Sequence, residues 1–258
     1  MTSMANAQQF QSGLAQYISV YSPDYWPVWL TLAGILFVGM LLVLALHAFL
    51  RLAFRRKSTQ VHEEEKVYLY SKAVRYWHWS NATLFILLLA TGLTNHFALA
   101  SASVTSTLVA LHHLCGYLLI AVWFGFVLIN LFAGNGHHYR IKPQGWMGRA
   151  MKQAKFYLVD IIKGEDHPFA ATEQSKFNPL QQVAYLGIMY GLLPLLIITG
   201  LMTLNPTWFP TIRHSILQLH LFFAVIGLFF VFAHLYLCTT GRTFTQTFKS
   251  MIDGYHRH

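Results

Sequence analysis

Five long apolar stretches constrain this chain more than any other feature of its sequence. A helix needs roughly 20 residues to cross a bilayer core of about 30 Å, and inside the bilayer the backbone must satisfy its own hydrogen bonds, which favours helices. The chain is 55% hydrophobic and only 10% charged, with a mean hydropathy of +0.43, which is too apolar for a soluble domain. The sequence therefore predicts an all-α integral membrane protein with spans at about 28–50, 77–99, 107–132, 182–204 and 214–238.

The positively charged residues predict how the spans are oriented. Lys and Arg are concentrated between spans one and two, between spans three and four, and after span five, whereas Arg213 is alone on the opposite side. Cytoplasmic loops are enriched in Lys and Arg, so we expect a protein of the bacterial inner membrane with a periplasmic N-terminus and a cytoplasmic C-terminus. These loops also explain the net charge of +9, which therefore does not indicate a nucleic-acid partner.

The spans divide the chain into four parts. Residues 1–27, which form the first part, contain no Lys or Arg and lack the basic start of a cleavable signal peptide. A basic, amphipathic stretch at 145–164 predicts a helix on the membrane surface, and Pro194 predicts a kink in span four. We expect no internal repeat. The parts are a periplasmic segment (1–27), an additional transmembrane helix (28–50), a four-helix bundle (70–240) with a cytoplasmic loop (133–178), and a cytoplasmic tail (241–258).

Two histidines in the last apolar stretch point to the chemistry of the bundle. His220 and His234 are fourteen residues apart, so on a helix they differ in direction by roughly 40° and in height by about 21 Å. Both therefore lie on one face of one membrane helix, near opposite sides of the bilayer. Ionisable side chains in a span are costly and usually functional. This spacing suits two stacked haems, each of which needs a second axial ligand from another helix.

The other ligands follow from depth in the membrane. His78 begins span two on the cytoplasmic side and pairs with His234, whereas His112 or His113 begins span three on the outer side and pairs with His220. Adjacent helical residues point about 100° apart, so only one of His112 and His113 can be axial, and we favour His112. Cofactor sites of this kind form in the cores of helix bundles. The absence of a Cys-x-x-Cys-His motif excludes covalent c-type attachment, so two haem b groups are expected.

Small and basic residues near these histidines support a haem-binding bundle. Gly92 is fourteen residues after His78, and Gly116 is one turn after His112, so both would leave room for a porphyrin, as would Gly200. Arg75 on the inner side and Arg213 on the outer side would pair with haem propionates through charge-assisted hydrogen bonds.

The chain resembles the di-haem cytochrome b subunits of membrane-bound formate dehydrogenases, nickel–iron hydrogenases and thiosulfate reductases. The resemblance covers about 70–240 and rests on Arg75-x-x-His78-Trp79, on Leu111-His112 with Gly116, and on the final histidine pair. The first span, its PDYWPVWL entry and the GNGHHYR, HPF and KFNPLQ motifs of the long loop look most like the thiosulfate reductase subunit. His113 departs from the pattern, since formate dehydrogenase subunits tend to carry proline there.

The resemblance implies an electron-transfer subunit with no catalytic residues other than those of a quinol-oxidising site. It implies a menaquinol donor and two partners, a periplasmic iron–sulfur subunit and a molybdopterin catalytic subunit. A quinone site beside the inner haem would use the loop at 133–178, because a second haem is needed only if electrons cross the membrane. A quinone site on the outer side is the alternative. Its candidate hydrogen-bonding residues are Asn135, His138, Arg140, Gln144 and Gln181.

Three alternatives remain at this point. The chain would equally serve as the anchor of a formate dehydrogenase or a hydrogenase, passing electrons to quinone. A histidine-dependent proton or metal transporter is a more distant alternative, because it predicts carboxylates in the spans and the last four spans contain none. A structural anchor without haem is disfavoured because all four ligand positions hold histidine.

Overall fold

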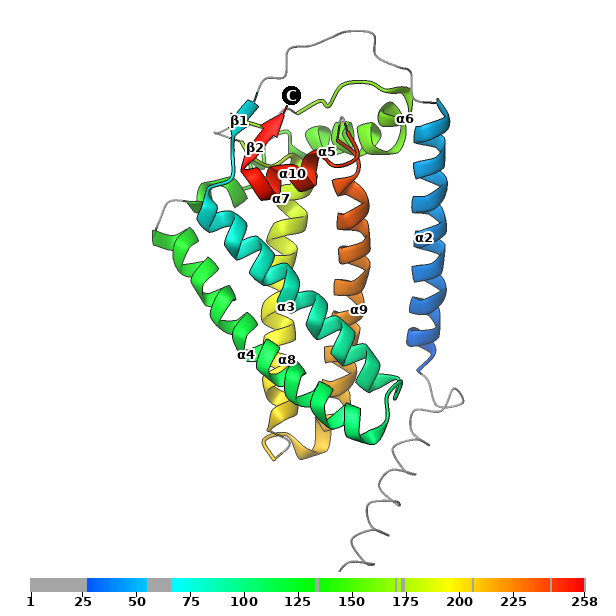
Figure 1. Ribbon diagram of the computed structural model, residues 1–258, viewed down its shortest axis with the longest axis vertical. Helices are drawn as coiled ribbons and strands as arrows, with labels where there is room; N and C mark the ends of the chain where they lie inside the picture. The colour runs from blue at the N-terminus through cyan, green and yellow to red at the C-terminus, as the bar shows by residue number, and fades with distance from the viewer. Residues whose placement is uncertain are drawn as a thin grey trace, which may run out of the picture.

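Five long helices form the described part of the molecule, as the computed structural model shows (Figure 1). The structure describes residues 27–54, 66–132, 135–169, 171–172, 175–205, 207–241 and 243–257, so nearly all of the predicted N-terminal segment lies outside the described residues. Consecutive long helices run in opposite directions, which agrees with successive crossings of a bilayer. Their bounds are α2 (Val28–Phe54), α3 (Lys72–His96), α4 (Ala102–Phe132), α7–η4–α8 (Pro179–Leu204) and α9 (Arg213–Cys238).

Four of the long helices are apolar enough to cross a membrane, namely α2, α4, α7–α8 and α9 with the short η5 (Pro210–Ile212) before it. Helix α3 has 25 residues, which is long enough, but its sequence is more polar. Lys72, Arg75 and His78 are near its start, and Asn95 and His96 are at its end. It contacts α4 more extensively than any other two described elements contact each other, so α3 is an integral part of the bundle.

The core of the bundle lies between α3, α4 and the α7–α8 helix. Phe85 and Leu89 from α3 pack against Phe126 from α4 and Leu193 from α8, with Leu119 and Met189 in the same cluster. Leu193 is only 1% exposed. This apolar cluster fixes the helices that carry the histidines.

Pro194 perturbs its helix one turn earlier than its own position. The residues before it form a π-helical turn, η4 (Gly187–Leu192), between α7 (Pro179–Leu186) and α8 (Leu193–Leu204). In a π-helix the carbonyl of Met189 would accept from residue 194, but proline has no N–H. That carbonyl instead accepts a hydrogen bond from Nε1 of Trp123 on α4 at 2.7 Å. The predicted kink is therefore a widened turn held by a neighbouring helix.

The additional helix α2 is in contact with both α9 and α6 (Ile161–Lys163). Leu30 is buried against Leu221 and Val225 at one end. At the other end Arg51 donates a hydrogen bond to the carbonyl of Thr239 at 3.0 Å, and His47 hydrogen-bonds to the hydroxyl of Tyr236. Helix α2 is thus part of the folded bundle.

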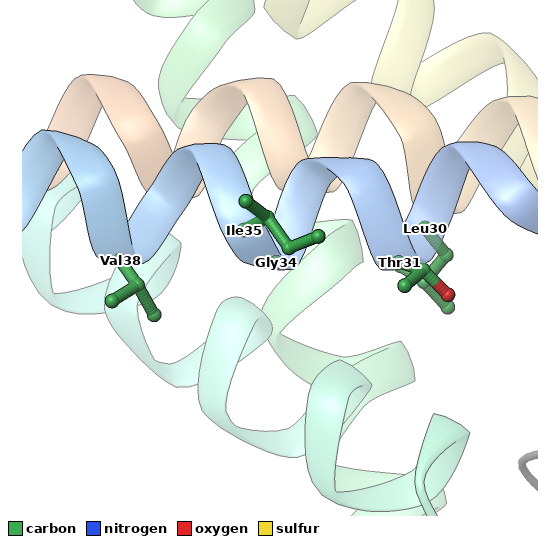
Figure 2. A pocket seen from close by; sticks show the side chains of 5 residues that line it. All are labelled: Leu30, Thr31, Gly34, Ile35 and Val38. Atoms are coloured by element: carbon green, nitrogen blue, oxygen red, sulfur yellow. The ribbon is translucent and has the colours of Figure 1, made fainter.

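An open apolar groove of about 430 Å³ lies along α2 and is lined by Leu30, Thr31, Gly34, Ile35 and Val38 (Figure 2). None of the predicted site residues lines it. Its apolar lining suits the acyl chains of lipid.

Apart from η5, the shorter described elements gather at one end of the bundle, where the described parts of the loop at 133–178 and of the C-terminal tail meet (Figure 1). The tail folds into α10 (Gln246–Asp253) and a strand, β2 (Tyr255–Arg257), which pairs antiparallel with β1 (Lys66–Tyr68). The predicted surface helix is α5 (Trp146–Lys155), a π-helical turn η3 (Phe156–Asp160) and α6 (Ile161–Lys163). The described segments that were expected in the cytoplasm therefore lie at the same end.

Candidate functional site

The structure brings the four predicted ligands together in two pairs. The ring centres of His78 on α3 and His234 on α9 are 6.4 Å apart. Those of His112 on α4 and His220 on α9 are 6.3 Å apart. Helix α9 contributes one histidine to each pair. The pairing by membrane depth is therefore what the folded chain shows, although the role of these histidines as ligands stays a prediction.

These separations fit an iron held between two imidazoles. A nitrogen–metal bond is about 2.0 Å long for imidazole ligands. The centre of a five-membered ring with bonds of about 1.35 Å is about 1.15 Å from its atoms. Two coaxial imidazoles on one iron therefore have ring centres roughly 6.3 Å apart. Both pairs match this value, so the residues present fit bis-histidine haem.

Two threonines hold the rings of the pair formed by His112 and His220. Oγ1 of Thr91 on α3 is 2.9 Å from Nδ1 of His112, and Oγ1 of Thr199 on α8 is 2.9 Å from Nδ1 of His220. Both threonines are buried. The sequence prediction missed them, because threonine is common in membrane helices and each is 21 positions from its histidine.

The glycine after each threonine lies against the ring of the same histidine. A Cβ on Gly92 would be 3.0 Å from Cε1 of His112, and a Cβ on Gly200 would be 3.3 Å from Cε1 of His220. These glycines thus make room for the histidine rings themselves, which adds to the porphyrin space predicted from sequence. By contrast, a Cβ on Gly116 would meet nothing within 4 Å, so that position is open.

The same arrangement occurs twice, and the expectation of no internal repeat is wrong here. Thr91-Gly92-Leu93 on α3 and Thr199-Gly200-Leu201 on α8 are offset by 108 positions, as are Leu111-His112 and Leu219-His220. In each half a Thr-Gly pair on one helix lies against the histidine ring of the next helix. The repeat escapes a scan of the sequence because few other residues match.

His113 is exposed on α4, whereas His112 faces His220. This difference favours His112 of the two alternatives that the sequence left open.

The pair formed by His78 and His234 has different surroundings. Nδ1 of His78 is buried and has no hydrogen-bond partner within the described ranges. The ring of Phe230 stacks on His234 with centres 5.5 Å apart. Cys238 places its sulfur 3.7 Å from Nε2 of His234. No threonine hydroxyl is recorded against either ring among the described residues.

The two predicted propionate partners differ in how they are held. Nη1 of Arg75 donates to the carbonyl of Ile252 on α10, and its buried Nε has no partner in the described part of the chain. Arg75 therefore keeps a donor near His78 that a carboxylate would satisfy. Arg213 is exposed at the start of α9, at the other end of the bundle.

Of the five predicted quinone-site residues, His138 has the most suitable surroundings. It lies in the short helix η2 (Asn135–Tyr139) and is 6% exposed. Its Nδ1 has no hydrogen-bond partner among the residues described. Its carbonyl accepts from Nε2 of Gln182 at 3.2 Å, a contact that sequence reasoning missed.

The remaining quinone candidates have less suitable surroundings, or surroundings that the structure does not describe. Arg140 and Gln144 are exposed, and the side chain of Asn135 lies outside the described residues. Gln181 forms a capping box at the start of α7, where its Oε1 accepts from the backbone N–H of Asn178 at 3.1 Å. This bond gives Gln181 a structural task.

Burial, together with the positive charge of Lys176, lowers the pKa of His138 to about 4. The imidazole is therefore neutral near pH 7, and a neutral imidazole both donates and accepts a hydrogen bond. An unpaired ring nitrogen in a buried position suits a hydroxyl or carbonyl group of a ligand.

A row of aromatic rings connects His138 with His234. Phe177 is 6.4 Å from His138 and 5.0 Å from Tyr185, and Tyr185 is 6.4 Å from His234, all measured between ring centres. This row of rings connects the long loop with the histidine pair at the same end of the bundle.

The bundle and its two histidine pairs define a multi-pass membrane protein of the cytochrome b class. The family model of prokaryotic cytochrome b561 matches residues 69–254, and the chain belongs to this family. The matched region includes both histidine pairs and leaves out α2. Members of the family bind haem b and transfer electrons in membranes.

A curated relative extends this similarity to the whole chain. The chain is 62% identical over 262 positions to a protein of Escherichia coli strain K12 named "Putative cytochrome YdhU", and the alignment covers all of both chains. Helix α2 therefore falls within the aligned region. No solved structure matches the chain significantly.

Proposed function

We propose that the chain is the membrane subunit that oxidises menaquinol and delivers electrons to a periplasmic iron–sulfur and molybdopterin reductase, with thiosulfate reductase as the expected partner. His78 and His234 would hold an inner haem, and His112 and His220 an outer haem. The observation that carries the proposal is the two ring separations of 6.4 and 6.3 Å. When bound, the haems supply one-electron transfer between the two sides of the membrane.

The two pairs are far enough apart to serve opposite sides of a bilayer. Gly92 contacts the ring of His112 and is fourteen residues along α3 from His78. That interval corresponds to about 21 Å of helix, compared with a bilayer core of about 30 Å. The residues would therefore place one haem near each surface.

The quinol site would lie at the end of the bundle that carries the basic loops. His138 is neutral and buried. Its Nδ1, which has no partner among the described residues, would accept a hydrogen bond, and then a proton, from a quinol hydroxyl. Gln182 holds the backbone of His138. Phe177 and Tyr185 would provide the apolar wall for a quinone ring, between His138 and His234.

The opposite end would meet the periplasmic iron–sulfur subunit. Trp208, Phe209 and Ile212 are exposed in the turn that leads into α9, near the outer pair. Aromatic and apolar side chains of this kind are enriched at the centres of protein interfaces. Arg213 adds a positive charge beside them.

Haem content of the full-length chain tests the proposal. We expect two b-type haems per chain in the reduced-minus-oxidised spectrum, and one haem in His234→Ala and in His112→Ala. His113→Ala is the matched control and should keep both haems, because His113 is exposed. His234→Ala should also stop quinol-dependent reduction of the remaining haem. Loss of neither haem in His234→Ala would refute the pairing, and membranes that reduce no thiosulfate with a menaquinol donor would refute the partner.

A further inference from the structure

Each threonine hydroxyl beside the outer pair already has a partner for its proton. Oγ1 of Thr91 is 2.7 Å from the carbonyl of Leu87, and Oγ1 of Thr199 is 2.7 Å from the carbonyl of Leu195. A hydroxyl has one proton to donate. A carbonyl can only accept, so the proton of each hydroxyl is directed to its own helix.

The hydroxyl oxygen must therefore accept a hydrogen bond from the histidine. The partner atom is Nδ1 in both cases, so Nδ1 of His112 and of His220 carries the proton. The lone pair of each neutral ring is then on Nε2. The same bond restricts rotation of the ring. Both features prepare Nε2 to bind iron.

Burial strengthens this argument. Thr91 is 4% exposed and Thr199 is 7% exposed, so water does not compete for these hydrogen bonds. The helix backbone also lies close to each ring at the next residue, because a Cβ added there would be 3.0 Å from Cε1 of His112 at Gly92 and 3.3 Å from Cε1 of His220 at Gly200. In each half of the repeat, one Thr-Gly pair sets both the tautomer and the position of the ring.

We propose that Thr91 and Thr199 are positioning residues that fix the Nδ1-protonated tautomer of His112 and His220 and lower the midpoint potential of the outer haem. This inference rests on the proposed function, because it requires that these histidines bind a haem. An acceptor on Nδ1–H makes an imidazole ligand more basic, which stabilises the oxidised iron. The inner pair lacks such a hydroxyl in the described chain, so the two haems should differ in this respect.

Variants of the full-length chain, purified in detergent, test the proposal by redox titration and haem quantification. Thr91→Val and Thr199→Val keep the shape of the side chain and remove the acceptor. Thr91→Ser and Thr199→Ser keep the hydroxyl and provide the rescue. Thr203→Val is the matched control, because Oγ1 of Thr203 donates to the carbonyl of Gly200 at 2.7 Å and no histidine contact is recorded for it.

We expect both valine variants to raise the midpoint potential of the haem that His112→Ala removes and to leave the potential of the other haem unchanged. Both serine variants should keep the two wild-type potentials. Partial loss of that haem in the valine variants alone would also support the proposal. Two haems with unchanged potentials in the valine variants would overturn the inference and leave the proposed function intact. An equal shift in Thr203→Val would overturn it too. If His112→Ala loses no haem, the proposed function itself fails.

Discussion

Gly92→Ala tests how closely α3 approaches the ring of His112. The added Cβ would be 3.0 Å from Cε1 of His112, whereas carbon atoms in contact prefer about 3.5–4.0 Å. The ring must therefore retreat by about 0.5 Å or more, against the hydrogen bond that Thr91 makes to Nδ1. Overpacking of this kind costs about 1–3 kcal/mol, so haem should bind at the outer site roughly 5 to 150 times more weakly.

The assay is haem per chain during dilution or competition with a haem-binding protein, together with the potential of the outer haem. Alanine also favours the helix by about 1 kcal/mol over glycine, but that gain applies with and without haem and does not alter haem affinity. Gly125→Ala on the same bundle is the matched control, since its Cβ would meet nothing within 4 Å. Gly200→Ala should have a smaller effect, because its contact is 3.3 Å. A Gly92→Ala chain with wild-type affinity and potential would refute the reasoning.

Three further predictions concern packing, docking and pH. Gly227→Ala would bring a Cβ within 2.7 Å of Cζ of Phe85 and should lower stability by about 1–3 kcal/mol in thermal unfolding, with partial recovery in the double variant with Phe85→Leu. Tyr236→Phe removes the hydrogen bond to His47 and should lower the unfolding temperature while both haems stay; loss of haem instead would contradict the peripheral position of α2. The pKa of His138 is lowered from 6.5 to about 4, so the folded state favours the neutral ring. The stability that the neutral ring of His138 contributes is complete above about pH 6.5 and should be lost as the pH falls toward 4. Unfolding midpoints between pH 7.5 and 4.5 should therefore fall more in the wild type than in His138→Asn, and equal slopes would count against burial of His138.

The helices and the histidine pairs could be predicted from the sequence because two simple rules determine them. Apolar length predicts a span, and a fourteen-residue interval returns a helix to nearly the same face. These rules placed His220 and His234 on one face of α9 and matched them by depth with His112 and His78. Hydropathy supports the second predicted span least, because α3 contains several polar residues that lower its mean hydropathy.

The contacts that refine the site depend on how helices approach one another, which no local pattern specifies. The contact of Thr91 with His112 joins neighbouring helices across 21 positions, and its recurrence at Thr199 and His220 became visible only once both contacts were in place. Gln181 and Gln182 show the same limit at shorter range. The capping box turns Gln181 to the helix end, so Gln182 is the residue that reaches the loop.

The contribution of α9 to both pairs imposes an order on biogenesis. Helix α9 is the last of the long helices, and the ribosome completes it only after α3, α4 and α8 have been made. A nascent chain that ends before His220 has no complete pair, and one that ends between His220 and His234 has only the outer pair. In the proposed arrangement, haem loading would therefore wait until the final helix has inserted, and the site of His112 and His220 would become available before that of His78 and His234.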